Sequence, residues 1–164
     1  MPFDFTGEEA KLYPSTFEES KQITRRVRES LAVNYSIYNP KHIVEYFKAY
    51  IYQPFRDFEQ EEMWLLLCNN RSIVTHDIQL YVGTINQIPM RPAEVFRDAF
   101  RYNAASIAIS HVHPSGVATP SDADLKVTEK LVALGKELDM PILDHVIVGR
   151  EECTSFAMNG IGGF

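Results

Sequence analysis

The pattern of apolar and polar positions along the chain predicts a protein that mixes strands with helices. Two apolar runs, at residues 63–68 and 72–83, flank an asparagine-containing turn and predict a β-hairpin. Two further, mainly apolar runs predict buried strands at residues 104–110 and 140–148. Apolar residues at helical spacing predict four helices, one at residues 18–33, one that follows Pro40 and ends at Pro54, and two at residues 91–102 and 121–138.

The order of these elements indicates one principal domain of class α/β (α+β) with a short extension before it. Residues 1–54 are expected to form a helical N-terminal extension, and residues 55–164 the domain itself. A chain of 164 residues is long enough to bury a core. The glycines near the C-terminus, at positions 160, 162 and 163, predict a frayed tail.

The segment after the third predicted strand carries candidate metal ligands. His111 and His113 are two residues apart, so in an extended strand their side chains share one face, about 6.5 Å apart along the strand. Pro114 and Gly116 then turn the chain, and Asp124 follows near the start of the next helix. Two neutral imidazoles and one carboxylate suit zinc, and three protein ligands leave a fourth tetrahedral position open to water. We therefore predict a catalytic zinc site at His111, His113 and Asp124, called the ligand triad below.

The same residues also admit a structural interpretation. Ser121 and Asp124 form an S-x-x-D version of a capping box, and Pro120 after Thr119 is a second possible helix start. Asp124 could therefore serve only as a helix cap. The two histidines are harder to explain in this way, because a pair at strand spacing, followed by a turn and by an acid at a helix start, matches a metal site.

A second pair of candidate residues, Asp144 and His145, lies inside the last predicted strand. Adjacent aspartate and histidine admit a catalytic role. Within a buried apolar strand, a hydrogen-bonded structural pair is the more common outcome, and the structural role is the one we expect.

The chain from His111 to Asp124 reads H-V-H-P-S-G-V-A-T-P-S-D-A-D. It resembles the signature of RadC-like proteins, a branch of the JAB/MPN superfamily of zinc metallohydrolases with the JAMM motif (H-x-H, seven residues, S-x-x-D). The spacing is kept in full, and the resemblance covers about residues 55–160. Val112 stands where the family usually has asparagine, but in an extended strand its side chain points away from the metal.

The resemblance implies a curved mixed sheet flanked by helices, with Zn²⁺ held by the ligand triad. It also implies a general base on an early strand, which the family pattern places at Glu61. Glu62 is the alternative, because a one-residue shift in register would exchange the two. Ser121 matches the serine of the motif, which implies a role in stabilising a tetrahedral oxyanion. The implied activity is that of a JAMM-type, zinc-dependent hydrolase, which cleaves a peptide or isopeptide bond with a zinc-activated water.

Composition limits the partners. The net charge of −6 argues against a general nucleic-acid-binding protein, because contacts to phosphates need clustered lysine and arginine. Residues 1–55 show no G-x-G signature of the helix-hairpin-helix segment that RadC proteins typically carry, which counts against an inherited role at DNA. The two cysteines lack C-x-x-C spacing, and the N-terminus does not resemble a signal peptide. We expect a cytoplasmic protein without a membrane span that acts on an unknown protein or peptide.

Two other classes of function compete with the hydrolase. One is a non-catalytic, RadC-like interaction module associated with DNA repair or with the processing of mobile-element DNA. A pure scaffold has no physical need of an open metal site, which counts against this hypothesis. The other is a magnesium-dependent nuclease, which two histidine ligands disfavour because magnesium prefers carboxylates and water.

Overall fold

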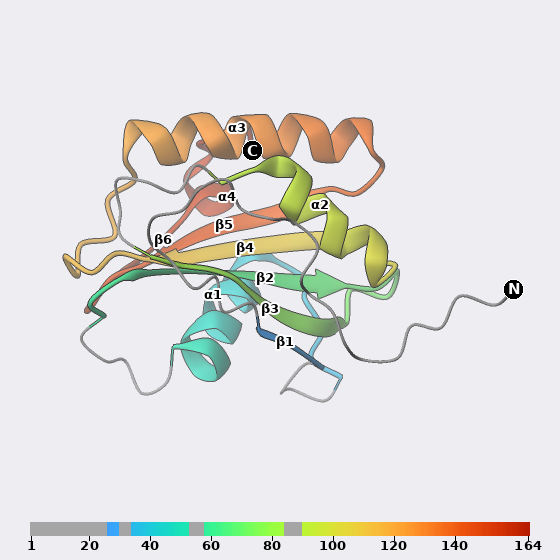
Figure 1. Ribbon diagram of the computed structural model, residues 1–164, viewed down its shortest axis with the longest axis horizontal. Coiled ribbons are helices and arrows are strands. Elements are labelled where there is room, and N and C mark those ends of the chain that lie inside the picture. The colour runs from blue at the N-terminus through green and yellow to red at the C-terminus, as the bar shows by residue number, and fades with distance from the viewer. Residues whose placement is uncertain (1–25, 30–33, 53–57, 84–89) are drawn as a thin grey trace, which may run out of the picture.

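The computed structural model describes residues 26–29, 34–52, 58–83 and 90–164. Within them lies a six-stranded sheet with the order β1-β3-β2-β4-β5-β6 (Figure 1). Its strands are β1 (Arg26–Glu29), β2 (Glu61–Cys68), β3 (Val74–Gly83), β4 (Ser106–Val112), β5 (Ile142–Val148) and β6 (Cys153–Ser155). Neighbouring strands are antiparallel except for β4 and β5, which are parallel. The sheet is therefore mixed, as predicted.

Helices cover both faces of this sheet. They are α1 (Pro40–Tyr46) with the π-helical turn η1 (Phe47–Ile51), α2 (Pro92–Arg101), α3 (Asp122–Glu137) and the short α4 (Phe156–Asn159). Figure 1 shows α2 and α3 on one face, called the α3 face below, and α1 on the other, called the α1 face. Among the described residues, no helix is long and apolar enough to cross a membrane.

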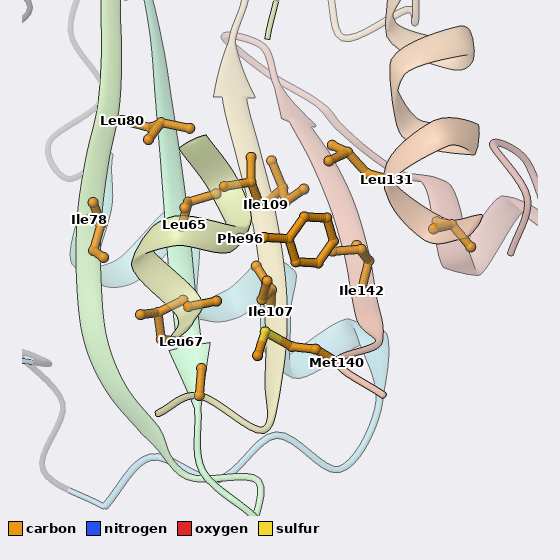
Figure 2. Close-up of a cluster of buried hydrophobic side chains, with 14 of the residues drawn as sticks. Leu65, Leu67, Ile78, Leu80, Phe96, Ile107, Ile109, Leu131, Met140 and Ile142 are labelled. Atoms are coloured by element: carbon orange, nitrogen blue, oxygen red, sulfur yellow. The ribbon is translucent and has the colours of Figure 1, made fainter. Parts of the chain in front are cut away.

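Each face of the sheet has its own hydrophobic core, and β2 contributes to both. Leu65 and Leu67 belong to the core on the α3 face, whereas Leu66 and Cys68 belong to the core on the α1 face. Side chains of a strand alternate between faces, so a strand buried on both sides is apolar without interruption. Figure 2 shows the core on the α3 face, where Phe96 of α2 lies among the aliphatic side chains of the strands.

The connection from β4 to β5 determines which residues meet at the end of the sheet. Parallel neighbours need a crossover, and here α3 forms it on one face of the sheet. The carboxyl end of β4 therefore lies next to the segment that leads into α3. The predicted strands and helices from residue 58 onward are confirmed, as is the helix that follows Pro40.

The helix predicted at residues 18–33 is wrong where the structure describes it. Residues 26–29 form the strand β1, which pairs antiparallel with β3. Apolar residues at every fourth position fit one stripe of a helix, but the pairing that an open sheet edge offers is a tertiary interaction, and it overrides the local pattern. The rest of this predicted helix lies outside the described residues.

The prediction of a frayed C-terminal tail is also wrong. Phe164 packs against two of the hydrophobic clusters. Gly162, with φ of +67°, approaches the molecule so closely that a Cβ there would stand 2.6 Å from Cδ1 of Phe156 and 2.9 Å from Cγ2 of Thr128. The tail therefore packs against α3 and α4. The boundary at residue 54 stays a prediction.

Candidate metal centre

The two histidines of the ligand triad lie at the carboxyl end of β4. His111 pairs with Met63 of β2 and with Ile147 of β5. His113 follows the strand by one residue, and its N–H donates to the carbonyl of Val148 at 3.1 Å. This extended backbone keeps both rings on one face, with their Nε2 atoms 2.9 Å apart. The side chain of His111 is 2% exposed and that of His113 is 14% exposed.

The turn after the histidines is fixed by two glycines. Gly116 has φ of +78°, its N–H donates to the carbonyl of His113, and its own carbonyl accepts from Arg150 N–H at 2.8 Å. Gly149 lies so close that a Cβ there would stand 2.5 Å from the carbonyl oxygen of Gly116. The turn thereby brings the carbonyl of Val117 within 2.8 Å of Nδ1 of His113. The loop itself orients this histidine.

Asp124 reaches the histidines from the first turn of α3. Its Oδ2 accepts from the N–H of Ser121 at 2.8 Å and from the Ser121 hydroxyl at 2.6 Å, while Ser121 Oγ accepts from the N–H of Asp124. This is a capping box. Its Oδ1 lies 3.4 Å from Nε2 of His111, and Oδ2 lies 3.7 Å from Nε2 of His113. The cap and the candidate ligand are therefore the same residue, and the two interpretations of the sequence are compatible.

The ligand triad has the donor set of a zinc site. One ligand atom from each residue lies within 4.8 Å of the others, and no second cluster of this kind occurs among the described residues. The carbonyl of Val117 can only accept, so the proton of His113 sits on Nδ1 and its Nε2 presents a lone pair toward the other ligands. Two imidazoles and one partly exposed carboxylate fit zinc by the chemistry of the donors.

The electrostatics of the two histidines differ. Burial lowers the pKa of His111 to about 4, against the opposing charge of Asp124. For His113 burial acts in the same direction, but the nearby Asp124 carboxylate and the Val117 carbonyl, which favour a protonated ring, outweigh it and raise the pKa. The pKa of Asp124 is lowered, because the neighbouring His113 and His111, which favour the ionised carboxylate when protonated, and the hydrogen bonds from Ser121 outweigh its burial. The carboxylate is therefore ionised and available to a cation.

The register of β2 separates the two candidate bases. Met63 lies opposite His111 and packs against the core on the α3 face, so Glu61, two residues earlier, shares the face of the ligand triad. Burial raises the pKa of Glu61, and the charges of His113 and Asp124 act on it. Glu62 points to the α1 face, where it accepts hydrogen bonds from Trp64 Nε1 at 3.2 Å and Gln79 Nε2 at 3.0 Å. Of the two, Glu61 is next to the candidate metal centre.

His145 lies closer to the metal centre than the sequence suggested. Its Nε2 is 2.8 Å from Nδ1 of His111, and its Nδ1 is 2.6 Å from Oγ1 of Thr128 in α3. Asp144 instead accepts hydrogen bonds from the Ser155 hydroxyl and from Ala157 N–H, a structural role as expected. The only sequence signal for His145 was a histidine inside a buried strand, which needs a partner.

The chain is similar to known proteins along most of its length. A family model described as "RadC-like JAB domain" matches residues 37–161. A UPF0758 protein of Chloroflexus aggregans is 36% identical over 149 residues, which are 90% of this chain and 63% of that protein. A UPF0758 protein of Vibrio vulnificus (strain YJ016) is 38% identical over 137 residues, which are 83% of this chain and 59% of that protein. The chain thus spans about three fifths of the length of these relatives. It belongs to the family of RadC-like JAB-domain proteins.

Proposed function

We propose that this protein is a zinc-dependent hydrolase that cleaves a peptide or isopeptide bond in a protein or peptide substrate. The observation that carries the proposal is the convergence of three ligand atoms within 4.8 Å of one another, next to a carboxyl group on the same face of the sheet. A non-catalytic protein of this fold would need neither the cluster of ligand atoms nor the nearby carboxyl group. The membership in the JAB-domain family supports the same chemistry.

Each residue of the centre has a role in this proposal. His111, His113 and Asp124 hold the zinc ion, which when bound supplies a Lewis acid that activates water and polarises the scissile carbonyl. Glu61 accepts a proton from the attacking water and delivers it to the leaving amine. Its raised pKa suits this exchange, because a carboxyl group with a pKa nearer to neutral returns the proton more readily.

Ser121 has a more constrained role than the resemblance implied. Its single hydroxyl proton points to Oδ2 of Asp124 at 2.6 Å, so in this arrangement it orients the carboxylate. To donate to an oxyanion, the hydroxyl must leave Asp124 during the reaction. We propose that Ser121 first positions the third ligand and turns toward the substrate only as negative charge develops there.

The first experiment is the zinc content of untagged protein by elemental analysis, for the wild type and for Asp124→Asn. Asp122→Asn is the matched control, because it removes the same charge from the same first turn of α3 without touching a ligand. We expect about one zinc per chain in the wild type and the control, and a loss or weakening in Asp124→Asn. A wild type that binds no zinc after reconstitution would remove the hydrolase proposal.

The second experiment tests cleavage on peptide and isopeptide substrates. Glu61→Gln should retain zinc and lower the rate about 100-fold to 10,000-fold, the typical contribution of a general base. Glu62→Gln is the control, since Glu62 lies on the opposite face of the sheet. Cleavage that survives in Glu61→Gln would show that Glu61 is not the base.

A further inference from the structure

Behind His111, two buried side chains continue the hydrogen bonding away from the candidate metal centre. Nδ1 of His111 meets Nε2 of His145 at 2.8 Å. Nδ1 of His145 meets Oγ1 of Thr128 at 2.6 Å, and this hydroxyl lies 2.5 Å from the backbone carbonyl oxygen of Asp124. We call His145 and Thr128 the relay. Both side chains are completely buried.

The backbone carbonyl of Asp124, at the end of this chain of hydrogen bonds, determines which group donates in each of them. The carbonyl of Asp124 can only accept, so the hydroxyl of Thr128 donates its single proton to it. The hydroxyl can then only accept from His145, which places the proton of that ring on Nδ1. Nε2 of His145 is therefore an acceptor, and the proton of His111 lies on Nδ1. The Nε2 atom of His111 is left with a free lone pair.

We propose that His145 and Thr128 are positioning residues that hold His111 in the one neutral tautomer able to bind a cation through Nε2. This inference rests on the proposed metal centre, and it concerns two residues that are not ligands. With the relay reversed, Nε2 of His111 would carry a proton and could not bind the metal. The hydroxyl oxygen of Thr128 would then also face a carbonyl oxygen at 2.5 Å with no proton between them.

The packing around the relay holds the His145 ring and the Thr128 side chain in place. The ring of Phe156 stacks on His145 with centroids 4.8 Å apart and an angle of 20° between the planes. The methyl group of Thr128 faces Gly162 of the C-terminal tail, where any side chain would collide with it. Asp144 holds α4, and hence Phe156, through the Ser155 hydroxyl at 2.6 Å. The relay is thus enclosed by α3, α4 and the tail.

The test compares Thr128→Val with Thr128→Ser. Valine keeps the shape of threonine but removes the hydroxyl, whereas serine keeps the hydroxyl, so the pair separates the relay from packing. Zinc affinity is measured by competition with a chromophoric chelator. We expect weaker affinity in Thr128→Val and near the wild-type value in Thr128→Ser. The loss in Thr128→Val should be at most about 10-fold to 100-fold, the usual effect of losing the direct partner of a ligand histidine, because Thr128 acts on His111 through His145.

A second readout needs no metal. Nitrogen chemical shifts in long-range proton–nitrogen correlation spectra identify the tautomer of each of the five histidines in metal-free protein at neutral pH. We expect the proton on Nδ1 of both His111 and His145 in the wild type and in Thr128→Ser. In Thr128→Val we expect a population with the proton on Nε2 of His111. A purely structural role of the hydroxyl would not move these shifts.

The outcomes are distinct. A wild-type spectrum with the proton on Nε2 of His111 overturns the inference, and this measurement stands even if Thr128→Val does not fold. A folded Thr128→Val variant with unchanged tautomers and unchanged zinc affinity also overturns it. A wild type with the expected tautomers that binds no zinc contradicts the proposed function but supports the direction of the relay.

Discussion

His111 and His113 lie two residues apart at the carboxyl end of β4, with their rings on one face, yet the protein holds them by different means. Nδ1 of His111 meets a side chain from β5, 34 residues further along the chain, and the ring is 2% exposed. Nδ1 of His113 meets the carbonyl of Val117, only four residues away, and its ring is 14% exposed. The folded core therefore orients one ligand, and a local turn orients the other. A mutation in the core should therefore disturb His111, whereas a mutation in the turn should disturb His113.

The largest expected difference between the two histidines is in the stability of the metal-free protein. His111→Ala leaves a cavity in the core and removes the partner of the buried Nε2 of His145, so the free energy of unfolding should fall by about 3 kcal/mol. His113→Ala removes a ring at the edge of the turn and should cost less than about 1 kcal/mol. Urea unfolding in the presence of a chelator measures both values. Equal losses would contradict the division into core and turn.

The next effect addresses the turn that holds His113. In Gly149→Ala the new Cβ would stand 2.5 Å from the carbonyl oxygen of Gly116, so the backbone must shift and stability should fall by about 1–3 kcal/mol. The shift should also move Val117 relative to His113 and leave the tautomer of His111 unchanged. Urea unfolding measures the loss of stability, and the histidine spectra report the tautomers. A change in the tautomer of His111 alone would contradict the claim that this turn orients His113 and not His111.

The smallest effect is the pH dependence of stability without metal. Burial lowers the pKa of His111 to about 4, whereas the unfolded chain has a pKa of about 6.5. Between these values the unfolded state binds the extra proton, so His111 makes the free energy of unfolding fall by about 2 kcal/mol from pH 7 to pH 5. The raised pKa of His113 has the opposite sign, because its contribution is present at low pH and is lost as the pH rises.

His111→Gln isolates this contribution. Other titrating groups, such as Asp144 with a pKa raised by burial to about 6, are present in both proteins and largely cancel in the comparison. The variant should therefore lose about 2 kcal/mol less than the wild type between pH 7 and pH 5. Urea unfolding at both pH values, with a chelator present, measures the difference. An identical pH dependence would show that His111 is not held neutral by the fold.

The predictions from sequence were most accurate where the signal is local. The spacing from His111 to Asp124 was sufficient to predict three residues that the structure brings together, because a strand, a turn and a helix start fix their relative positions over a short stretch of chain. The alternation of Leu65 and Leu66 between two cores likewise follows from the period of a strand. The choice between Glu61 and Glu62 needed the pairing register of β2, which the sequence alone does not contain.

The features that were missed depend on contacts between distant segments. His145 meets His111 only because β5 returns parallel to β4, and Thr128 meets His145 only because α3 crosses one face of the sheet. The strand β1 exists because β3 offers it an edge, although its own residues also fit a helix. The tail is ordered by Phe164, which finds a place against two clusters built from other elements. None of these contacts has a periodic signature in the chain.

The crossover from β4 through α3 to β5 has a consequence for the denatured chain. A peptide of residues 110–124 contains all three ligands of the proposed zinc site, but it lacks the two groups of β5 that hold the histidines, His145 and the Val148 carbonyl. A cation should therefore gain little by chelation to the denatured chain and much more from the native one. The melting temperature would then rise with the logarithm of the zinc concentration. The fraction of chains that hold zinc would report the fraction of the protein that is native.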